Sequence, residues 1–365
     1  MAVRALASGL ALLLAGCTAA APAPPAPAAA GWVAASLPAP GGPAGQLVVR
    51  DAAGCGDRWY AVGGVLGPGD ATRPAAWDST DGRTWQSVRF VPLPGSYYGP
   101  QNLIDSVACA AGRVAMVGAR PGGAHGNPRV STWRLRPDGS MAEVSASFET
   151  YGGDSAVNVA HVAAGPDGFL ITGNRTSGAA IWLSPDGAGF RLVENAPGLA
   201  DDATQLSVAR DAVDGPDGQW VVVGGLAPKQ SADQLPAVWL TPDGSRFART
   251  PVPAPAGYNE LQRVVRLGDD LVAVGPRGSA LGAWRAHGGV WTQAGTFPGT
   301  SVESLAVAHG CLIAATGTRL WRSADRGQSW QALAPPAGAT APMAVAGRSD
   351  TVLLATGGRV WTLAE

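Results

Sequence analysis

The 365-residue sequence predicts an all-β fold, a seven-bladed β-propeller in which each blade has four strands. One unit recurs seven times: an apolar strand, a short turn, a Val/Ala-rich strand that ends in Gly, a loop, a strand that ends in Trp, a turn with Asp-Gly, and an aromatic-led strand. The spacing of the units fits four-stranded blades joined by loops of variable length. The central tryptophans of the seven units are Trp77, Trp133, Trp182, Trp239, Trp284, Trp321 and Trp361.

The second strand of each unit is its most regular part. It is a near-continuous run of Val, Ala, Leu and similar residues, which is typical of strands buried on both faces where blades pack against blades. The chain after the N-terminal segment shows no helical periodicity. The seven glycine-ended strands are 60–63, 115–118, 170–173, 221–224, 272–275, 314–317 and 354–357.

The two ends of the repeat region are predicted to share the seventh blade. The last unit stops at residues 361–365 without an aromatic-led fourth strand, whereas residues 31–38 resemble residues 85–92, the outer strand of the first unit. Residues 32–37 are therefore expected to supply the outer strand of the last blade. This pairing closes the ring and removes an open sheet edge, so the propeller domain covers residues 31–365.

The N-terminus is predicted to be a signal peptide, residues 1–16, followed by a lipid-modified cysteine. Arg4 supplies a positive charge, and the apolar run at 5–14 is shorter than the roughly 20 residues that span a bilayer as a helix. The tetrad Leu-Ala-Gly-Cys that ends at Cys17 resembles the lipobox of bacterial lipoproteins. The resemblance implies export, cleavage before Cys17, and a lipid on its thiol that anchors the protein to the extracytoplasmic face of the membrane. The alternative is an ordinary secretory signal that contains a cysteine.

The segment after the lipidated cysteine is expected to be a linker. Residues 17–30 consist of Cys17 and a stretch made almost entirely of Ala and Pro. Such a stretch favours an extended, semi-rigid chain, because proline fixes φ and nothing in the sequence forms a core. It is therefore interpreted as a stalk between membrane and propeller.

Bulk composition excludes several functions. The formal net charge is −1 with no basic cluster, so no nucleic-acid partner is expected. The sequence contains no phosphate-binding loop, no nucleophile elbow and no Cys-x-x-Cys, and no cofactor is expected. The four histidines fall in four different units without a carboxylate partner nearby in sequence, so no metal site is expected; they are His125, His161, His287 and His309. The chain is expected to be a monomer.

Three cysteines remain once Cys17 is modified. An oxidising compartment permits a disulfide. Cys55 and Cys109 both lie just before the second strand, in neighbouring units, where equivalent positions come close together. They are expected to pair, which leaves Cys311 as a buried thiol.

The turn between the third and fourth strands resembles the Asp-box of sialidase and BNR-repeat propellers, written S-x-D-x-G-x-[TS]-W. Residues 323–330 fit the motif, residues 79–85 are one residue shorter, and 184–190 and 241–247 are weaker copies. Aspartate accepts hydrogen bonds from turn amides and glycine adopts positive φ, so the role expected for these aspartates is structural, the alternative being calcium binding or catalysis. They are Asp81, Asp186, Asp243 and Asp325.

The resemblance implies no catalytic residue here. Sialidase activity in that family requires three arginines that bind a carboxylate, a Tyr–Glu nucleophile pair and an Asp acid. Two Arg-Asp pairs lie at the ends of first strands, near where a central channel would be. No third arginine is convincingly placed, Arg266 being the candidate, and no Tyr–Glu pair can be assigned. The fold alone does not confer function. The candidate channel charges are Arg50, Asp51, Arg210, Asp211 and Arg266, with Asp105 and Glu303 as further carboxylates.

One rim of the ring is predicted to carry a binding site. On the face with the second-to-third-strand loops, residues 64–74, 119–129 and 225–235 are long, while 317–319 and 357–359 are minimal, and long loops on a rigid scaffold commonly bind ligands. Blade-to-blade connections on that rim hold tyrosines and amides, which suit a sugar or a peptide strand; the alternative is that they only pack and cap the loops. The candidate residues are Tyr98, Asn102, Tyr151, Asn158, Gln205, Tyr258 and Asn259.

The leading hypothesis is a lipid-anchored, non-catalytic module that binds a protein or a glycan, or serves assembly, at the cell surface. Two alternatives stay open. One is a glycoside hydrolase with a degenerate sialidase-like site, which paired carboxylates in one pocket would favour. The other is a tethered scaffold without a ligand site.

Overall fold

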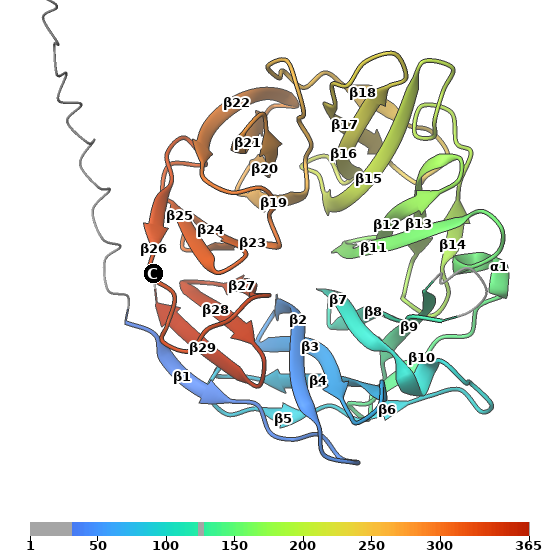
Figure 1. The fold of residues 1–365 in the computed structure, drawn as a ribbon, viewed down its shortest axis with the longest axis vertical. Helices are drawn as coiled ribbons and strands as arrows, with labels where there is room; N and C mark the ends of the chain where they lie inside the picture. The colour runs from blue at the N-terminus through green and yellow to red at the C-terminus, as the bar shows by residue number, and fades with distance from the viewer. Residues whose placement is uncertain (1–30, 123–127, 365) are drawn as a thin grey trace, which may run out of the picture.

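The computed structural model describes residues 31–122 and 128–364, and it confirms the seven-bladed β-propeller. Seven antiparallel sheets follow one another around a single axis (Figure 1). The only helical segments among the described residues are the 3-10 turn η1 (Gly99–Gln101) and α1 (Phe148–Tyr151). No helix in this part of the chain is long and apolar enough to cross a membrane. The predicted signal peptide, Cys17 and the Ala/Pro linker lie outside the described residues, as does His125.

Each blade runs outward from an inner strand beside the ring axis to an outer strand at the perimeter. The inner strands of blades 1 to 7 are β2 (Gln46–Cys55), β7 (Leu103–Ala110), β11 (Ala156–Gly165), β15 (Gln205–Asp214), β19 (Arg263–Leu267), β23 (Ser304–Ala308) and β27 (Ala344–Arg348). The second strands are β3 (Arg58–Leu66), β8 (Arg113–Arg120), β12 (Gly168–Arg175), β16 (Trp220–Pro228), β20 (Asp270–Arg277), β24 (Cys311–Thr316) and β28 (Thr351–Thr356).

The third strands carry the repeated tryptophan, and the outer strands are mostly short. The third strands are β4 (Thr72–Ser79), β9 (Arg129–Leu135), β13 (Gly178–Ser184), β17 (Leu235–Thr241), β21 (Ala280–His287), β25 (Arg319–Ser323) and β29 (Arg359–Ala364). The outer strands are β5 (Gln86–Ser87), β10 (Met141–Glu143), β14 (Arg191–Val193), β18 (Ala248–Thr250), β22 (Val290–Phe297), β26 (Gln331–Leu333) and β1 (Val33–Ser36).

The two ends of the repeat region meet in blade 7, as predicted. β1 pairs antiparallel with β29, and Val33 lies opposite Thr362. The residue after the strand, Leu37, is buried in the core between blades 7 and 1. The carbonyl of Pro38 then accepts a hydrogen bond from the Trp77 indole at 2.8 Å. The first described residues therefore join the last blade to the first through both backbone and core contacts.

The outer strand predicted for blade 1, residues 85–92, is wrong in its second half. β5 is only two residues long, and the chain then forms β6 (Phe90–Val91), which pairs parallel with β10 of blade 2. The Phe90 ring packs edge-on against Trp133 of blade 2, with ring centroids 5.0 Å apart. The Phe90 side chain thus packs against the core formed between blades 1 and 2.

The repeated tryptophans form the centres of the blade cores. All seven are buried, and five of them have no accessible surface. Several donate their indole N–H to the connection that enters the same blade, at 2.5 Å from Trp182 to the Thr150 carbonyl and at 2.8 Å from Trp284 to the Pro253 carbonyl. A single residue type thus fills the core and fixes the adjacent connection.

The repeated glycines have two different structural roles. In blades 1 to 5 the glycine lies inside the second strand, so the prediction that it ends the strand is wrong there. A side chain at Gly63 would collide with the Val48 carbonyl oxygen beside a bulge in β2, and Gly224 approaches β15 in the same way. In blades 6 and 7 the glycine does follow the strand. Gly317 and Gly357 occupy tight turns with φ of 58° and 57°.

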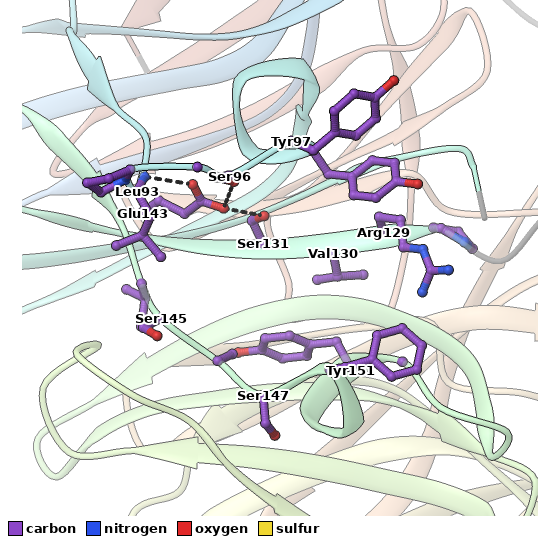
Figure 2. A pocket seen from close by; sticks show the side chains of 18 residues that line it. Leu93, Ser96, Tyr97, Arg129, Val130, Ser131, Glu143, Ser145, Ser147 and Tyr151 are labelled. Atoms are coloured by element: carbon purple, nitrogen blue, oxygen red, sulfur yellow. Dashed lines mark hydrogen bonds between the residues drawn. The ribbon is translucent and has the colours of Figure 1, made fainter.

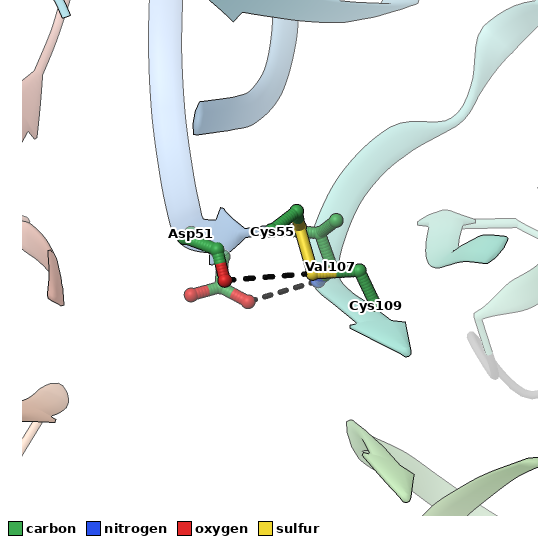
Figure 3. The surroundings of a disulfide bond; sticks show 5 residues. Asp51, Cys55, Val107 and Cys109 are labelled. Atoms are coloured by element: carbon green, nitrogen blue, oxygen red, sulfur yellow. Dashed lines mark hydrogen bonds between the residues drawn. A yellow bond between two sulfur atoms is a disulfide. The ribbon is translucent and has the colours of Figure 1, made fainter. Parts of the chain in front are cut away.

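A disulfide joins the inner strands of blades 1 and 2. Cys55 at the end of β2 is bonded to Cys109 of β7, with Cα atoms 5.7 Å apart (Figure 3). In the same figure the Asp51 carboxylate accepts a hydrogen bond from the Val107 amide at 2.9 Å. The two blades are therefore linked covalently at one end of the strands and by a buried polar contact further along. Cys311 is buried.

The aspartates of the Asp-Gly turns organise their own turns. Asp81 accepts backbone N–H groups from Thr84 at 2.7 Å and Arg83 at 2.8 Å, and the Thr84 amide contributes most to holding the pKa of this carboxyl well below its usual range. Equivalent bonds run from Ala188 to Asp186 at 2.8 Å, from Ser245 to Asp243 at 2.9 Å and from Ser329 to Asp325 at 2.9 Å. Each carboxylate thus satisfies turn amides that have no partner in a strand.

Deleting residues 31–38 should destabilise the whole ring, because it exposes the edge of β29 and removes the buried Leu37 side chain. We expect the free energy of unfolding to fall by at least about 3 kcal/mol, the usual scale for losing one buried leucine. Urea unfolding followed by tryptophan fluorescence measures this change. Deleting residues 18–30 is the matched control and should shift the midpoint very little. Equal effects of the two deletions would contradict the closing role of β1.

Candidate functional site

A groove of about 510 Å³ lies where the connections into blades 2 and 3 run side by side (Figure 2). Its floor is the start of β9, and its two walls are the connection that contains residues 93–98 and the segment that leads into α1. Both connections belong to the rim on which the sequence analysis places a binding site. The groove is therefore the part of that rim whose geometry can hold a ligand.

Exposed aromatic rings form the walls of the groove. Tyr97 on one wall is 71% exposed, and Phe148 on the other is 60% exposed. The Tyr97 ring stands edge-on to Tyr98, with centroids 4.9 Å apart. Large aromatic side chains normally bury most of their surface. Two such rings left exposed on facing walls are suited to enclosing a flat or apolar ligand group.

Arg129, the first residue of β9, lies between these walls. Its guanidinium carbon is 4.8 Å from the centroid of the Phe148 ring and 5.8 Å from that of Tyr98. Both distances are in the range of cation–π contacts. The Nε atom is buried and donates no hydrogen bond to any residue that the structure describes. The rings of Phe148 and Tyr98 thus hold the guanidinium in place, and its terminal Nη groups, which hydrogen-bond to no described residue, are the donors that remain for a ligand.

Glu143 at the end of β10 holds the opposite end of the groove together. Its carboxylate accepts hydrogen bonds from the Leu93 amide at 3.0 Å, and from the Ser96 and Ser131 hydroxyls at 2.9 Å each. Figure 2 shows these bonds and places Glu143 and Arg129 far apart along the groove. Because the Glu143 carboxylate already accepts hydrogen bonds from three groups of the groove, it stabilises the wall and is not available to bind a ligand.

Most of the rim residues predicted from the sequence to bind a ligand instead form hydrogen bonds within the propeller. Tyr151 is buried below the groove and donates to the Thr132 hydroxyl at 3.3 Å. Asn102 and Asn259 are fully buried and donate to loop carbonyls of Tyr98 and Pro255, at 3.0 and 2.9 Å. The side-chain oxygen of Asn158 accepts from Asn174 at 2.7 Å, and that of Gln205 accepts from Arg249 at 2.9 Å. Of the seven candidates, Tyr98 and Tyr151 line the groove, and Tyr258 is exposed elsewhere.

Tyr258 lies next to Glu260, a Tyr–Glu neighbourhood that the sequence analysis did not assign. Glu260 is fully buried, and its Oε1 accepts from Arg210 at 3.0 Å and from Gln234 at 2.9 Å, while its Oε2 accepts from Gln262 at 3.1 Å. Burial raises the pKa of the Tyr258 phenol, and the Glu260 carboxylate raises it further. A carboxylate held by three donors beside a less acidic phenol is poorly suited to activating a nucleophile.

The candidate channel charges are paired with neighbours and do not form one cluster. Arg50 forms an ion pair with Asp105 of the next blade, and Arg210 forms one with Glu260. Arg266 lies at the far end of β19, where it forms an ion pair with Asp214 at 3.3 Å and donates to a turn carbonyl. The arrangement of three arginines around one carboxylate, which sialidase chemistry needs, is thus not formed by these residues.

His161 lies between aspartates from two other blades. Its Nδ1 is 2.8 Å from Asp211 Oδ1 in blade 4, and its Nε2 is 3.5 Å from Asp51 Oδ2 in blade 1. Each aspartate also accepts a backbone N–H from the blade that follows it, Asp51 from Val107 and Asp211 from Val264. Burial alone would lower the pKa of His161, but the charges and hydrogen bonds of Asp211 and Asp51 outweigh burial and raise it to about 9. The imidazole is therefore positively charged at neutral pH.

The expectation that no histidine has a carboxylate partner is wrong. His161 has two, and His287 Nδ1 lies 2.6 Å from Asp270 Oδ1. The partners come from other strands, which sequence spacing does not show. Within the described residues, no group of three or more metal-binding side chains could hold a metal ion.

Sequence reasoning missed the residues that build the groove. Arg129 ends a long loop, Phe148 lies in a connection, and Glu143 ends a short strand, so none of them belongs to a recurring position of the repeat. The available signal was their departure from the repeat. Phe148 is an aromatic residue outside the pattern, and Tyr97 is the first of two adjacent tyrosines.

Comparisons with known proteins support the fold and give no family. No protein-family model matches the sequence, and no curated protein matches it. The chain is similar in fold to the extracellular domain of a protein described as a one-component system, BT4673 of B. thetaiotaomicron, with a TM-score of 0.56, 12% identity and coverage of 90% of this chain and 39% of that chain.

Two further solved structures are similar. PorZ, a surface component of the type-IX secretion system of Porphyromonas gingivalis, has a TM-score of 0.56 at 13% identity over 86% of this chain and 46% of its own. The acylaminoacyl peptidase of Pyrococcus horikoshii has a TM-score of 0.52 at 9% identity over 87% and 52%. The chain therefore spans about half, or less, of the length of each of these three proteins, and the similarity concerns the propeller fold.

Stability should depend on pH through His161. Its folded pKa of about 9 lies above the unfolded value of 6.5. The ion pairs therefore contribute fully below pH 6.5, and their contribution is lost as the pH rises through 9. Relative to His161→Gln, wild type should be more stable by about 2–3 kcal/mol at pH 6, and the difference should shrink toward zero at pH 10.

Urea unfolding of the two proteins at a series of pH values measures this difference. His309→Asn, a change at an exposed turn residue, is the matched control and should show no pH-dependent difference from wild type. A difference between wild type and His161→Gln that stays constant from pH 6 to pH 10 would rule out a charged His161.

Proposed function

We propose that the protein is a non-catalytic binding module of the extracytoplasmic space, anchored through a lipid on Cys17, that holds a protein or glycan ligand in the groove between blades 2 and 3. The observation that carries the proposal is the groove itself, in which the exposed Tyr97 and Phe148 rings form the walls and the Arg129 guanidinium, packed on Phe148 and Tyr98, hydrogen-bonds to no described residue. Exposed aromatics and arginine are the side chains most often found at the centre of binding surfaces. Leaving apolar aromatic rings exposed to water costs free energy that a bound ligand would recover.

The position of the chain's first described strand is compatible with a tether. β1 lies on the perimeter of blade 7, on a different side of the ring from α1 and the groove (Figure 1). A stalk attached at the perimeter leaves both faces of the ring accessible. The disulfide between Cys55 and Cys109 fits an exported protein, since such bonds persist in oxidising compartments.

The Asp-box resemblance is part of the proposal as a description of the repeat, and it does not bring catalysis with it. The turn aspartates accept amides of their own turns, as a structural role requires. The channel carboxylates are occupied by Arg50, Arg210 and His161. Two of the three similar structures are an extracellular domain and a bacterial surface component, which agrees with the compartment proposed for this chain.

Binding should depend on the aromatic walls of the groove. Phe148→Ala and Tyr97→Ala should each weaken ligand binding at least about tenfold, because each removes an exposed ring that a bound ligand would cover. Both side chains are exposed, so stability should change by less than about 1 kcal/mol. A glycan array and a display library of peptides, probed with the full chain and each variant, measure the effect.

Val290→Ala is the matched control. Val290 is 67% exposed at the start of β22, outside the groove, and its truncation should leave ligand binding unchanged. Ligands that bind Phe148→Ala and wild type equally would place the site elsewhere. Hydrolysis of a glycoside that is lost in Asp211→Ala would replace the proposal with the glycosidase alternative.

Anchoring should depend on Cys17. Cys17→Ser removes the thiol that accepts the lipid, so the variant should appear in the soluble exported fraction while wild type stays with membranes. Fractionation with immunodetection, together with the mass of the mature N-terminus, measures this. Cys311→Ser is the matched control and should remain membrane-bound. Equal membrane association of Cys17→Ser and wild type would contradict the anchor.

A further inference from the structure

We infer that the natural ligand of the groove is an acidic peptide segment, in which an Asp or Glu side chain reaches Arg129 and a neighbouring apolar side chain packs between Tyr97 and Phe148. The inference rests on the proposed function and narrows its ligand from a protein or a glycan to one class. It follows from three properties of the groove: the chemistry of its one cation, the position of nearby carboxylates, and the small number of available polar side chains.

Arg129 supplies a donor that no residue of the scaffold uses. Its Nε is buried without an acceptor among the described residues, although Phe148 and Tyr98 fix the guanidinium plane. The Nε has almost no accessible surface, so a ligand in the groove meets the terminal Nη groups, which hydrogen-bond to no described residue. A carboxylate fits best, because its two oxygens match two neighbouring N–H groups of guanidinium in a forked geometry.

The carboxylates nearest the groove do not compete for Arg129. Glu143 is at the opposite end and is bound to Leu93, Ser96 and Ser131. Glu149 does not line the groove; its carboxylate lies over Gly153 on the other side of α1. An anionic ligand group therefore meets a positive charge at the Arg129 end, while Glu143 disfavours a second anion at the far end.

The polar side chains available in the groove are too few for a sugar. Sugars present many hydroxyls and are oriented by several convergent polar side chains. Among the described residues that line this groove there is no Asn, Gln, Asp or His, and the hydroxyls without a partner are those of Tyr97, Tyr98 and Ser145. Glu143 and Ser131 are bonded to each other, and the Ser147 hydroxyl pairs with Thr150 at 3.0 Å.

The remaining lining is largely apolar. The apolar residues that line the groove besides the aromatic rings include Pro94, Val130, Val144 and Ala146. One cation in an apolar and aromatic setting matches a carboxylate beside an apolar side chain, and acidic peptides offer this combination at adjacent positions.

The test is a selection from a displayed library of random heptapeptides on the full-length chain in detergent solution. The selected peptides should carry Asp or Glu next to an apolar residue. They should bind Arg129→Gln at least about tenfold more weakly than wild type, and Arg129→Lys to an intermediate degree, since lysine keeps the charge but not the fork. Arg319→Gln, a change at an exposed arginine at the start of β25 in blade 6, should bind like wild type.

A double-mutant cycle identifies the contact. Replacing the acidic residue of a selected peptide with Gln should weaken binding to wild type about tenfold and should change binding to Arg129→Gln by less than about twofold. Each variant is first shown to unfold at the wild-type temperature, so that a loss of binding is not a loss of fold.

The outcomes separate the two proposals. Groove-dependent peptides without an acidic residue, or a glycan whose binding is lost in Phe148→Ala, would overturn the acidic-peptide inference and leave the proposed binding function intact. If neither peptides nor glycans lose binding in Tyr97→Ala and Phe148→Ala, both proposals fail.

Discussion

The pairing of β1 with β29 is the interaction on which the rest of the structure depends. Seven sheets packed face to face form a stable ring only if the last blade meets the first, and the two ends of the repeat region accomplish this in one sheet. Leu37 then enters the core between blades 7 and 1, and Pro38 accepts the Trp77 indole N–H. Every blade is thereby held between two neighbours, and the connections on the rim acquire fixed positions relative to one another.

The geometry of the inner strands explains why the site lies on the rim and not in the channel. Bulges in the first four inner strands turn polar side chains toward the adjacent blade, where Asp51, Ser106 and Asp211 accept backbone N–H groups. The remaining charges pair across blades, as His161 does with Asp211. The channel side chains are thus used to hold blades together, and few of their polar groups remain to recognise a ligand.

The fold was largely predictable because its determinants are periodic. Each blade needs a buried second strand, a central tryptophan and an outer strand. Because these requirements recur seven times, each position in one unit could be compared with the same position in six others. The resemblance of residues 31–38 to 85–92 was recognised in this way. The second half of the first outer strand was not predictable. Its aromatic residue, Phe90, packs on Trp133 of the next blade, and a pattern of residue types does not state which of two equivalent cores a side chain enters.

For the candidate site, the sequence predicted the rim on which the groove lies but not the residues that form it. Loop length pointed to the rim on which the groove lies, and Tyr98 was among the residues chosen, but the amides of Asn102 and Asn259 donate to loop carbonyls. A buried Asn that caps its own connection and an exposed Asn that binds a ligand look alike in sequence. Arg129 and Glu143 were not predicted for a related reason. Their roles depend on residues that are close to them in the fold but distant in the sequence.

The departure of blade 1 from the repeat and the existence of the groove have one cause. Because β6 pairs with β10, the connection that follows β6 starts beside the outer strand of blade 2 and not beside blade 1. Glu143, the last residue of β10, can then accept the Leu93 amide and the Ser96 hydroxyl and hold this connection away from the segment leading into α1. The space that remains between the two is the groove. A repeat protein gains a specific site where one unit breaks the pattern, since an unbroken ring would present seven similar clefts with little to distinguish them.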